Sequence, residues 1–374
     1  MKRLMIVTIS AERRGGSDNV LWSFLRHADR SAFEPSVVFF GDGQLATDVE
    51  GLGIEVVRLP TGRLRQPGHV LKTVGRLASI MRERDPDLIL NWLSTAQIYG
   101  APAAVRARMS DRLVWWQHDL HSKAMSRGRT LDQAATLLPA LAVGACSNAA
   151  AASQRRLRPH RRVIPIHPGI ELAAPASDPA QSGNRAGLAI PEHRMLIGSV
   201  GRILPWKGHD RVLGAAERLV AMGRDVHILI VGGIGDESYR VSLAESARSP
   251  LLAGRVTFTG HVADATPYIQ ALDVLVSASD EEPFGLVILE AMEQEVPVVA
   301  PGRAGPAEII EHGRTGWLVD SPAPDDLADG VEALIEDPAL RKGLAAAALK
   351  RRREYFTAER MTLEMEAALL ELAR

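Results

Sequence analysis

The 374-residue sequence contains a single cysteine, Cys146, so the chain can form no internal disulfide and can build no metal site from cysteines. It also lacks any uninterrupted run of 18 apolar residues. The most apolar stretch, residues 137–145, is broken by Pro139 and Gly144 and does not predict a transmembrane helix. The apolar run within residues 1–7 is too short for a signal peptide. We therefore expect a cytoplasmic protein that does not span a membrane.

Aromatic residues make up only 5% of the chain, and lysine is scarce too, with six among the 44 basic residues. The apolar fraction of 46% is therefore mainly aliphatic, which is typical of helices packed on a parallel sheet. A charged fraction of 24% beside this apolar content excludes a disordered chain and a fibrous protein. At this length we expect two or three globular domains.

The net charge of −1 hides an uneven distribution. Residues 1–170 contain 24 basic and 14 acidic residues, whereas residues 171–374 contain 20 basic and 31 acidic ones. This asymmetry predicts two domains with different partners. Two interpretations stay open: the halves attract each other across a cleft, or the basic half meets an anionic partner such as a lipid surface or a phosphorylated acceptor. Scattered basic residues without interleaved aromatics argue against a nucleic acid partner.

Short apolar runs alternate with helix-like stretches in both halves, which is typical of βαβ units with a parallel sheet. The predicted strands of the first half cover residues 4–9, 37–40, 54–59, 88–92, 113–117 and 141–146. Those of the second half cover residues 195–200, 226–231, 256–259, 274–277, 297–300 and 317–319. The predicted helices include residues 19–28, 70–84 and 96–108.

A small, proline-rich stretch at residues 173–183 separates the halves and is typical of a linker. We therefore expect an α/β protein with two doubly wound, Rossmann-like domains that face each other across a cleft, over residues 1–172 and 184–355. The amphipathic pattern of residues 359–372 predicts a C-terminal helix. If a helix over about residues 356–374 packs back onto the first domain, that domain is discontinuous.

Open parallel sheets bind ligands at the carboxyl ends of their strands, so the loops that follow strands are candidate sites. Gly15 and Gly16 follow the first strand and would let a phosphate approach the next helix, although their spacing does not match Gly-x-Gly-x-x-Gly. His118 follows the fifth strand, where it could donate to a sugar hydroxyl or stabilise charge. A tight turn and a core histidine are the structural alternatives.

Arg202 and Lys207 stand in the loop after the first strand of the second half, between Gly201 and Gly208. A guanidinium group and an ammonium group five residues apart can bind one diphosphate. A solvated basic loop is the structural alternative.

Residues 279–290, with the sequence Ser-Asp-Glu-Glu-Pro-Phe-Gly-Leu-Val-Ile-Leu-Glu, follow a buried strand and begin a helix. Pro283 restricts Glu282 to an extended conformation, and we expect the Glu282 carboxylate at the loop tip. Gly285 and the residues after it would offer free N–H groups to an anion, and Glu290 is expected to face the same cleft from within the helix. The structural alternative is a solvated acidic loop followed by a surface residue of a helix.

Taken in order, these segments resemble the retaining glycosyltransferases of family 4, which have the GT-B fold. The resemblance runs from residue 4 to about residue 319. It is most specific in the second half, which contains Gly201-Arg202 with Lys207-Gly208, a Gly-Gly-x-Gly turn at 232–235, Phe258-Thr259-Gly260, and two glutamates eight residues apart. Residues 302–305 and 167–170 depart from the glycine-containing sequences usual in the family, which leaves the acceptor and the sugar open.

The resemblance implies a role for each candidate residue. Arg202 and Lys207 would bind the donor diphosphate and stabilise charge on the leaving nucleotide. Glu282 would hold hydroxyls of the donor sugar, and His118 would lie near that sugar and the reaction centre. These four are the candidate catalytic residues. The further donor-binding candidates, for the ribose, base, sugar, phosphates or acceptor, are Glu290, Val262, Phe284, Gly285, Leu286, Val287, Gly15 and Gly16.

The implied activity is a metal-independent, retaining transfer of a sugar from UDP-sugar or GDP-sugar to a hydroxyl acceptor, with no cofactor. The acceptor would be a glycan, a glycolipid or a natural-product precursor. The Asp-Pro-Asp sequence at residues 85–87 predicts a turn and not a metal site. The alternative functions are a catalytically silent nucleotide-sugar-binding partner protein and a GT-B sugar-nucleotide epimerase. An anionic or lipid-linked acceptor, and peripheral contact of the basic half with the inner face of the membrane, are open expectations.

Overall fold

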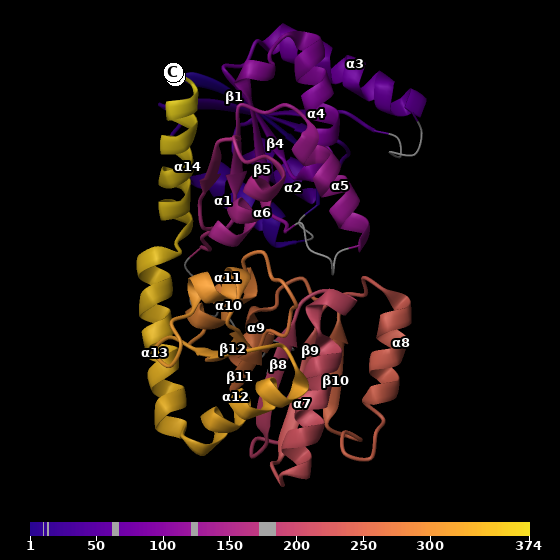
Figure 1. Cartoon of the computed structure of the whole chain (residues 1–374), viewed down its shortest axis with the longest axis vertical. Helices are drawn as coiled ribbons and strands as arrows, with labels where there is room; N and C mark the ends of the chain where they lie inside the picture. The colour runs from indigo at the N-terminus through magenta and orange to yellow at the C-terminus, as the bar shows by residue number, and fades with distance from the viewer. Residues whose placement is uncertain (10, 13–14, 62–66, 121–125, 172–184) are drawn as a thin grey trace. The chain divides into compact units, whose positions relative to one another are not determined.

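The computed structural model describes residues 1–374 except 10, 13–14, 62–66, 121–125 and 172–184. The chain divides into two compact units, Met1–Glu171 with Thr357–Arg374 and Leu172–Phe356. Each unit contains one parallel sheet covered by helices (Figure 1). In the part of the chain that is described, no helix is both long enough and apolar enough for a membrane span.

The first unit contains a seven-stranded sheet in the order β3-β2-β1-β4-β5-β6-β7, with every neighbouring pair parallel. The strands are β1 (Lys2–Thr8), β2 (Phe33–Phe39), β3 (Glu55–Arg58), β4 (Leu88–Trp92), β5 (Leu113–Gln117), β6 (Ala142–Ala145) and β7 (Val163–Pro165). The sequence did not predict β7, because this edge strand has only three residues and ends in a proline, which gives no apolar run.

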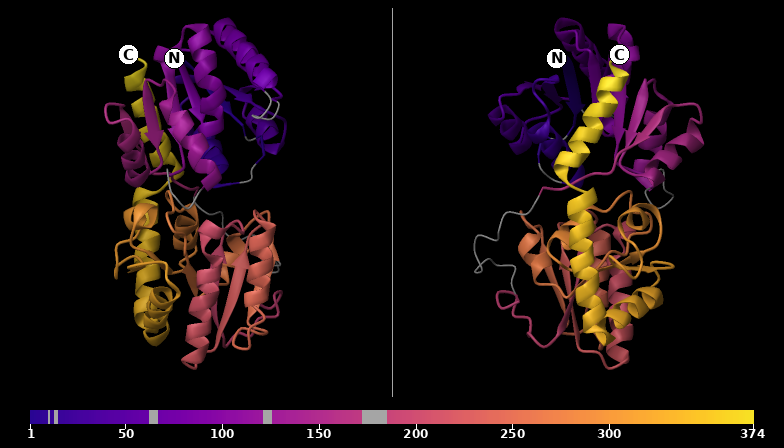
Figure 2. Two further views of the ribbon diagram at one scale, coloured as in Figure 1. Left: turned by 45° about the vertical axis from the view of Figure 1, so that its right-hand side comes forward. Right: turned by 90° about the vertical axis from the view of Figure 1, so that its left-hand side faces the viewer.

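The helices of the first unit lie on both faces of this sheet (Figure 2). They are α1 (Gly16–His27), α2 (Gln44–Gly51), α3 (Pro67–Arg84), α4 (Ser94–Ala107), α5 (Ser126–Leu137), α6 (Asn148–Leu157) and α14 (Ala358–Leu372), with the 3-10 turn η1 (Ser110–Arg112). The C-terminal helix α14 packs against α1, and the Glu366 carboxylate accepts a hydrogen bond of 2.6 Å from the backbone N–H of Asp29 just after α1. Helices α3 and α4 share one aliphatic core with β1, β2 and β4.

The second unit contains a six-stranded parallel sheet in the order β10-β9-β8-β11-β12-β13. The strands are β8 (Met195–Val200), β9 (Val226–Val231), β10 (Val256–Gly260), β11 (Val274–Val276), β12 (Val298–Pro301) and β13 (Trp317–Val319). All six predicted strands of the second half are present, and β8, β9 and β13 have the predicted bounds. Strands β8 and β9 are mostly apolar and buried along nearly their whole length, which is why the apolar pattern located them well.

The helices of the second unit are α7 (His209–Ala221), α8 (Glu237–Ser246), α9 (Thr266–Gln270), α10 (Leu286–Glu293), α11 (Ala304–Ile309), α12 (Pro324–Glu336) and α13 (Pro338–Tyr355), with the 3-10 turn η2 (Pro205–Lys207). Helices α7 and α12 pack together over one face of the sheet and enclose an aliphatic core with β8, β9 and β11. Helix α10 contacts α9 and α13. The two sheets therefore confirm the predicted pair of doubly wound, Rossmann-like folds.

Both sheets are wound outwards from a central pair of strands, β1 with β4 and β8 with β11. The chain leaves β8 towards one edge through β9 and β10, then returns to place β11 on the other side of β8. The connections that leave two such strands diverge, which opens a crevice at their carboxyl ends where ligands bind in this class of sheet. In the second unit, the loops that flank this crevice are the two loops with the strongest sequence motifs.

Candidate active site

The loop after β8 turns sharply before α7 begins. Gly208, the residue that precedes α7, has a φ of 70°, a conformation that favours glycine. A Cβ on Gly208 would lie 2.3 Å from the carbonyl oxygen of Ala278. Only glycine therefore lets this loop pack against the end of β11, and this contact brings Lys207 next to the loop that carries Glu282.

Lys207, Glu282 and Ser279 form a compact polar cluster between the two loops. The Lys207 ammonium donates to Oε2 of Glu282 at 2.7 Å, and the Ser279 hydroxyl donates to the same oxygen at 2.8 Å. The Glu282 side chain is only 9% exposed. The expectation that its carboxylate stands at the loop tip is therefore wrong, because charge-assisted hydrogen bonds hold it inside. The Lys207 ammonium also lies 4.3 Å from the ring centre of Trp206, at cation–π distance.

Arg211 holds the same two loops together from α7. Its guanidinium donates to the Ala278 carbonyl at 3.1 Å and to the Asp280 carboxylate at 2.7 Å. The carboxylate of Asp280 in turn raises the pKa of Arg211, chiefly through this hydrogen bond. The backbone N–H of Asp280 donates to the carbonyl of Trp206 at 3.2 Å. Sequence reasoning gave Arg211 no role, since a basic residue early in a helix carries no motif.

The N-terminus of α10 is supported by the first turn of α11, the helix that follows β12. Gly285 precedes α10 with a φ of 107°, and no side chain caps the helix. Gly305 donates its N–H to the carbonyl of Glu282 at 3.0 Å, and a Cβ on Gly305 would lie 2.2 Å from backbone atoms of Phe284. The first N–H groups of a helix, here those of Leu286 and Val287, have no helical carbonyl as partner and suit an anion.

Glu290 is half-buried on α10, within electrostatic reach of Lys207 and of the loop after β10. Burial raises the pKa of Glu290 to about 7; the negative charge of Asp264 adds to the rise, and the positive charge of Lys207 opposes it. Asp264 lies two residues beyond Val262, which is half-buried in the same loop. The structure thus brings Glu290 towards Lys207 and Asp264, and no motif in the sequence marks Asp264.

Arg202 differs from Lys207 in its surroundings. Its side chain is exposed and makes no hydrogen bond or ion pair with any other residue that the structure describes. Its backbone is fixed, because the carbonyl of Arg202 accepts a hydrogen bond of 3.2 Å from Nε2 of His209. The structure therefore fixes the backbone of Arg202 and leaves its guanidinium in solvent.

His209 was not predicted as a site residue, although it is the first residue of α7. Its Nδ1 lies 2.9 Å from the hydroxyl of Ser199 and its Nε2 faces the carbonyl of Arg202. Burial lowers the pKa of His209 to about 4, so the ring is neutral at neutral pH. A neutral ring that donates from Nε2 and accepts at Nδ1 satisfies both partners. His209 thus anchors the loop that carries Arg202 and Lys207.

The first unit contains the three other candidates. The His118 ring lies 4.7 Å from that of Trp92, and the indole N–H of Trp92 donates at 3.1 Å to the carbonyl of Ser17, directly after Gly16. Burial lowers the pKa of His118 to about 3, so the ring is neutral, and its Nε2 is buried with no partner among the described residues. His118 can therefore interact with a sugar hydroxyl as a neutral ring and not as an imidazolium.

Gly15 and Gly16 lie at the start of α1, which has no side-chain cap. Both glycines are exposed, and a Cβ on Gly15 would meet only the Asp18 carboxylate, at 3.9 Å. Packing within this unit therefore does not require glycine at position 15. The residues just before them, 13–14, lie outside the described residues.

Two doubly wound units of this kind, with a charged loop pair at the central strands of the second sheet, define the GT-B class of glycosyltransferase folds. The structure of Anabaena Alr3699/HepE in complex with UDP and glucose is similar, with a TM-score of 0.84 and 25% identity over 99% of this chain and 100% of that chain. The outer core galactosyltransferase WaaB shares the fold at 16% identity, with a TM-score of 0.73 over 99% of each chain.

Sequence comparison then gives the family. Residues 14–174 match Glycosyltransferase Family 4, and residues 181–351 match the glycosyl transferases group 1. Together with the structural similarity, these matches show that the chain belongs to family 4 of the GT-B glycosyltransferases.

Two curated relatives match part of the chain. The lipopolysaccharide core biosynthesis glycosyltransferase LpsE of Rhizobium meliloti is 33% identical over 162 residues, which is 43% of this chain and 46% of LpsE. A D-inositol 3-phosphate glycosyltransferase of Nocardioides is 33% identical over 209 residues, 52% of this chain and 45% of that protein. The chain spans about half the length of the curated relatives it matches.

Proposed function

We propose that this chain transfers a sugar from a UDP-sugar or GDP-sugar to a hydroxyl acceptor, with retention of the anomeric configuration and without a metal ion or cofactor. The observation that supports this most directly is the cluster of Lys207, Glu282 and Ser279 at the central strands of the second sheet. It places a positive charge and a hydrogen-bonding carboxylate beside the uncapped N-terminus of α10.

The departing nucleoside diphosphate is the group that these residues would stabilise. The N–H groups of Leu286 and Val287 and the positive end of the α10 dipole suit its phosphates. Lys207 is held beside them by Glu282, and Arg202, now in solvent, would turn towards the bound diphosphate. Fixed positive charge at the leaving group lowers the barrier as negative charge develops there. These groups supply the stabilisation that a metal ion gives in other transferases.

The remaining candidates would orient the sugar and the nucleoside. Both hydrogen bonds to the Glu282 carboxylate go to Oε2, so Oε1 can accept from a sugar hydroxyl. Phe284 and Gly285 would donate backbone hydrogen bonds to that sugar, and Glu290 would accept from the ribose hydroxyls. His118, as a neutral ring, would hydrogen-bond the donor sugar. Attack from the face that the diphosphate leaves, through an oxocarbenium-like state, needs no protein nucleophile.

A thermal-shift screen of nucleotide sugars, followed by a transfer assay, tests this proposal. We expect one UDP-sugar or GDP-sugar to stabilise the protein selectively and to be turned over in the presence of EDTA. Proton NMR of the product should show the anomeric configuration of the donor. Stabilisation without hydrolysis or transfer would instead favour a silent nucleotide-sugar-binding protein, and loss of activity in EDTA would exclude the metal-free mechanism.

The acceptor we propose is a hydroxyl of a glycan or glycolipid, reached with the basic first half in contact with the inner face of an anionic membrane. The excess of basic residues in residues 1–170 supports this contact. Cosedimentation with vesicles of phosphatidylglycerol should be strong at low ionic strength and weak at 0.5 M salt. Binding that does not depend on salt, or none at all, would contradict the membrane contact and leave the donor reaction unaffected.

A further inference from the structure

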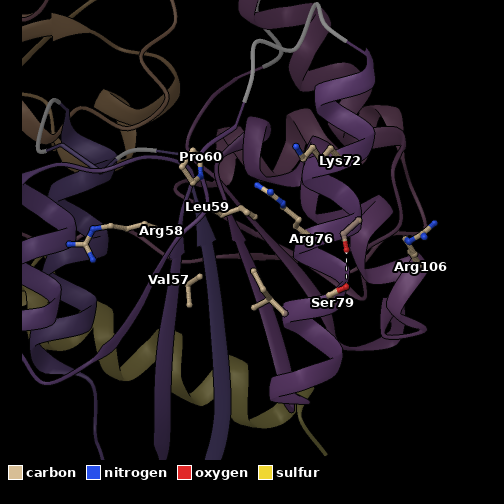
Figure 3. A pocket seen from close by; sticks show the side chains of 10 residues that line it. Val57, Arg58, Leu59, Pro60, Lys72, Arg76, Ser79 and Arg106 are labelled. Carbon is tan, nitrogen blue, oxygen red and sulfur yellow. Dashed lines mark hydrogen bonds between the residues drawn. The ribbon is translucent and has the colours of Figure 1, made fainter.

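A shallow groove of about 600 Å3, open to solvent, lies in the first unit at the carboxyl end of β3. One wall is apolar and consists of Val57, Leu59 and Pro60. Helix α3 forms the facing wall, and its Lys72 and Arg76 side chains point towards the apolar wall (Figure 3). No residue assigned to the donor site lines this groove.

The positive charge in the groove is not compensated. Lys72 and Arg76 are both exposed and make no hydrogen bond or ion pair with any residue in the described parts of the chain. They lie four residues apart on one helix face, where like charges repel and destabilise the helix. Arg58, at the edge of the same groove, is different: it points away and pairs with Asp42 and Glu50. No acidic side chain lines the groove among the residues described.

Gly75 keeps the groove open. It lies inside α3, where glycine lowers helix stability by about 1 kcal/mol relative to alanine. A Cβ at this position would meet nothing within 4 Å, so packing does not require glycine. One turn later, Ser79 turns its hydroxyl back to the carbonyl of Gly75 at 3.2 Å. Gly75 and the Ser79 hydroxyl that bonds its carbonyl both weaken α3, and both residues line this groove. Such local weakening is expected where function opposes stability.

We propose that this groove binds a phosphate-bearing amphiphile. Lys72 and Arg76 would bind the phosphate, and the apolar part would lie along Val57, Leu59 and Pro60. The groove is shallow and open to solvent, so a single amphiphile would lie along it and would not be enclosed. The proposed site is separate from the residues of the donor site and does not depend on the proposed reaction.

Isothermal titration calorimetry with hexyl phosphate, below its aggregation concentration, tests the site on the full chain. Inorganic phosphate and hexanol serve as partial ligands. The wild-type protein should bind hexyl phosphate at least tenfold more tightly than either partial ligand. The double variant Lys72→Glu, Arg76→Glu should weaken that affinity at least tenfold. The double variant Arg248→Glu, Lys342→Glu, which changes two exposed basic residues of the second unit, is the charge-matched control and should bind as the wild type does.

A second variant tests the shape of the groove. Gly75→Leu should fold with equal or greater thermal stability, because leucine favours a helix and enters open space. It should weaken hexyl phosphate more than inorganic phosphate. The proposal is overturned if hexyl phosphate binds no better than phosphate, if both variants bind it as the wild type does, or if only vesicles of phosphatidylglycerol bind. Unchanged affinity for UDP in each variant would show that the donor site is intact.

Discussion

Lys207 and Glu282 meet at 2.7 Å although 75 residues separate them in the chain. The contact forms because β8 and β11 are neighbours at the centre of the second sheet, so the loops that follow them lie side by side. The ion pair is mostly buried, with 18% of the lysine side chain and 9% of the glutamate side chain exposed. Each side chain therefore fixes the position of the other before any donor binds.

Lys207→Ala and Glu282→Ala should each lower turnover at least 100-fold, because each removes a charge that we propose to act on the leaving group or to orient the sugar. The fold should persist, as judged by circular dichroism. Glu281→Ala, which removes an exposed neighbouring carboxylate, is the control and should leave turnover near the wild-type value. Near-normal turnover in both of the first two variants would reject the proposed site.

Donor affinity should depend on the protonation of Glu290. Its pKa is raised to about 7, so the carboxyl is mostly protonated at pH 6 and mostly ionised at pH 8. Because the ionised form would accept hydrogen bonds from both ribose hydroxyls in the proposed site, affinity for UDP should rise up to about tenfold between these pH values. Calorimetry at pH 6, 7 and 8 measures this rise.

Glu290→Gln is the control for that titration, since UDP itself also changes its charge in this range. The difference between wild type and variant isolates the contribution of the carboxyl group. Parallel pH profiles for the two proteins would mean that Glu290 does not contact the nucleoside.

Gly305→Ala should disrupt the donor site, although Gly305 is not itself a donor-site residue. The added Cβ would lie 2.2 Å from backbone atoms of Phe284, so the segment at the start of α10 must move. We expect at least tenfold weaker binding of UDP by calorimetry. Gly302→Ala is the matched control: its Cβ would make only ordinary contacts, at 3.5 Å or more, and UDP should bind normally. Equal affinities for the two variants would show that the first turn of α11 does not support α10.

Ala304→Gly should stabilise the protein by roughly 0.5–1 kcal/mol. Ala304 has a φ of 50°, a left-handed conformation that costs a residue with a Cβ about 1 kcal/mol. Glycine removes that cost at the position where the family more commonly has consecutive glycines. Chemical denaturation measures the free energy of unfolding. Ala307→Gly, at an exposed position within the same helix, should have the opposite sign, and a loss of stability in both variants would contradict this account.

His209→Leu should impair donor binding and stability together. It leaves the Ser199 hydroxyl and the Arg202 carbonyl without their partner, which costs on the order of 1–3 kcal/mol for each buried group. His227→Leu is the comparison, because this histidine bonds Thr257 and contacts no donor-site loop. Both variants should unfold at lower denaturant concentration. Only His209→Leu should also raise the KM for the donor. Equal KM values for the two variants would mean that His209 has only a structural role.

The sequence alone determined every strand except β7, the two doubly wound folds and the loops that contain the candidate site residues. Apolar runs buried on both faces are visible without a structure, and glycines beside charged residues mark the ends of β8 and β11. The short edge strand β7 was not predicted, because Pro165 ends its apolar run after two residues. The family resemblance, and not the spacing, supplied the role of each residue.

Only the tertiary structure decided how these loops are used. The order of strands puts β11 beside β8, and this pairing turns Glu282 inward to Lys207 when the sequence suggested an exposed loop tip. The same packing gives His209 its anchoring contacts and leaves the Arg202 guanidinium in solvent. Local sequence sets the conformation of each loop. Hydrogen bonds and burial between residues far apart in the chain depend on which strands become neighbours, and no single segment encodes that.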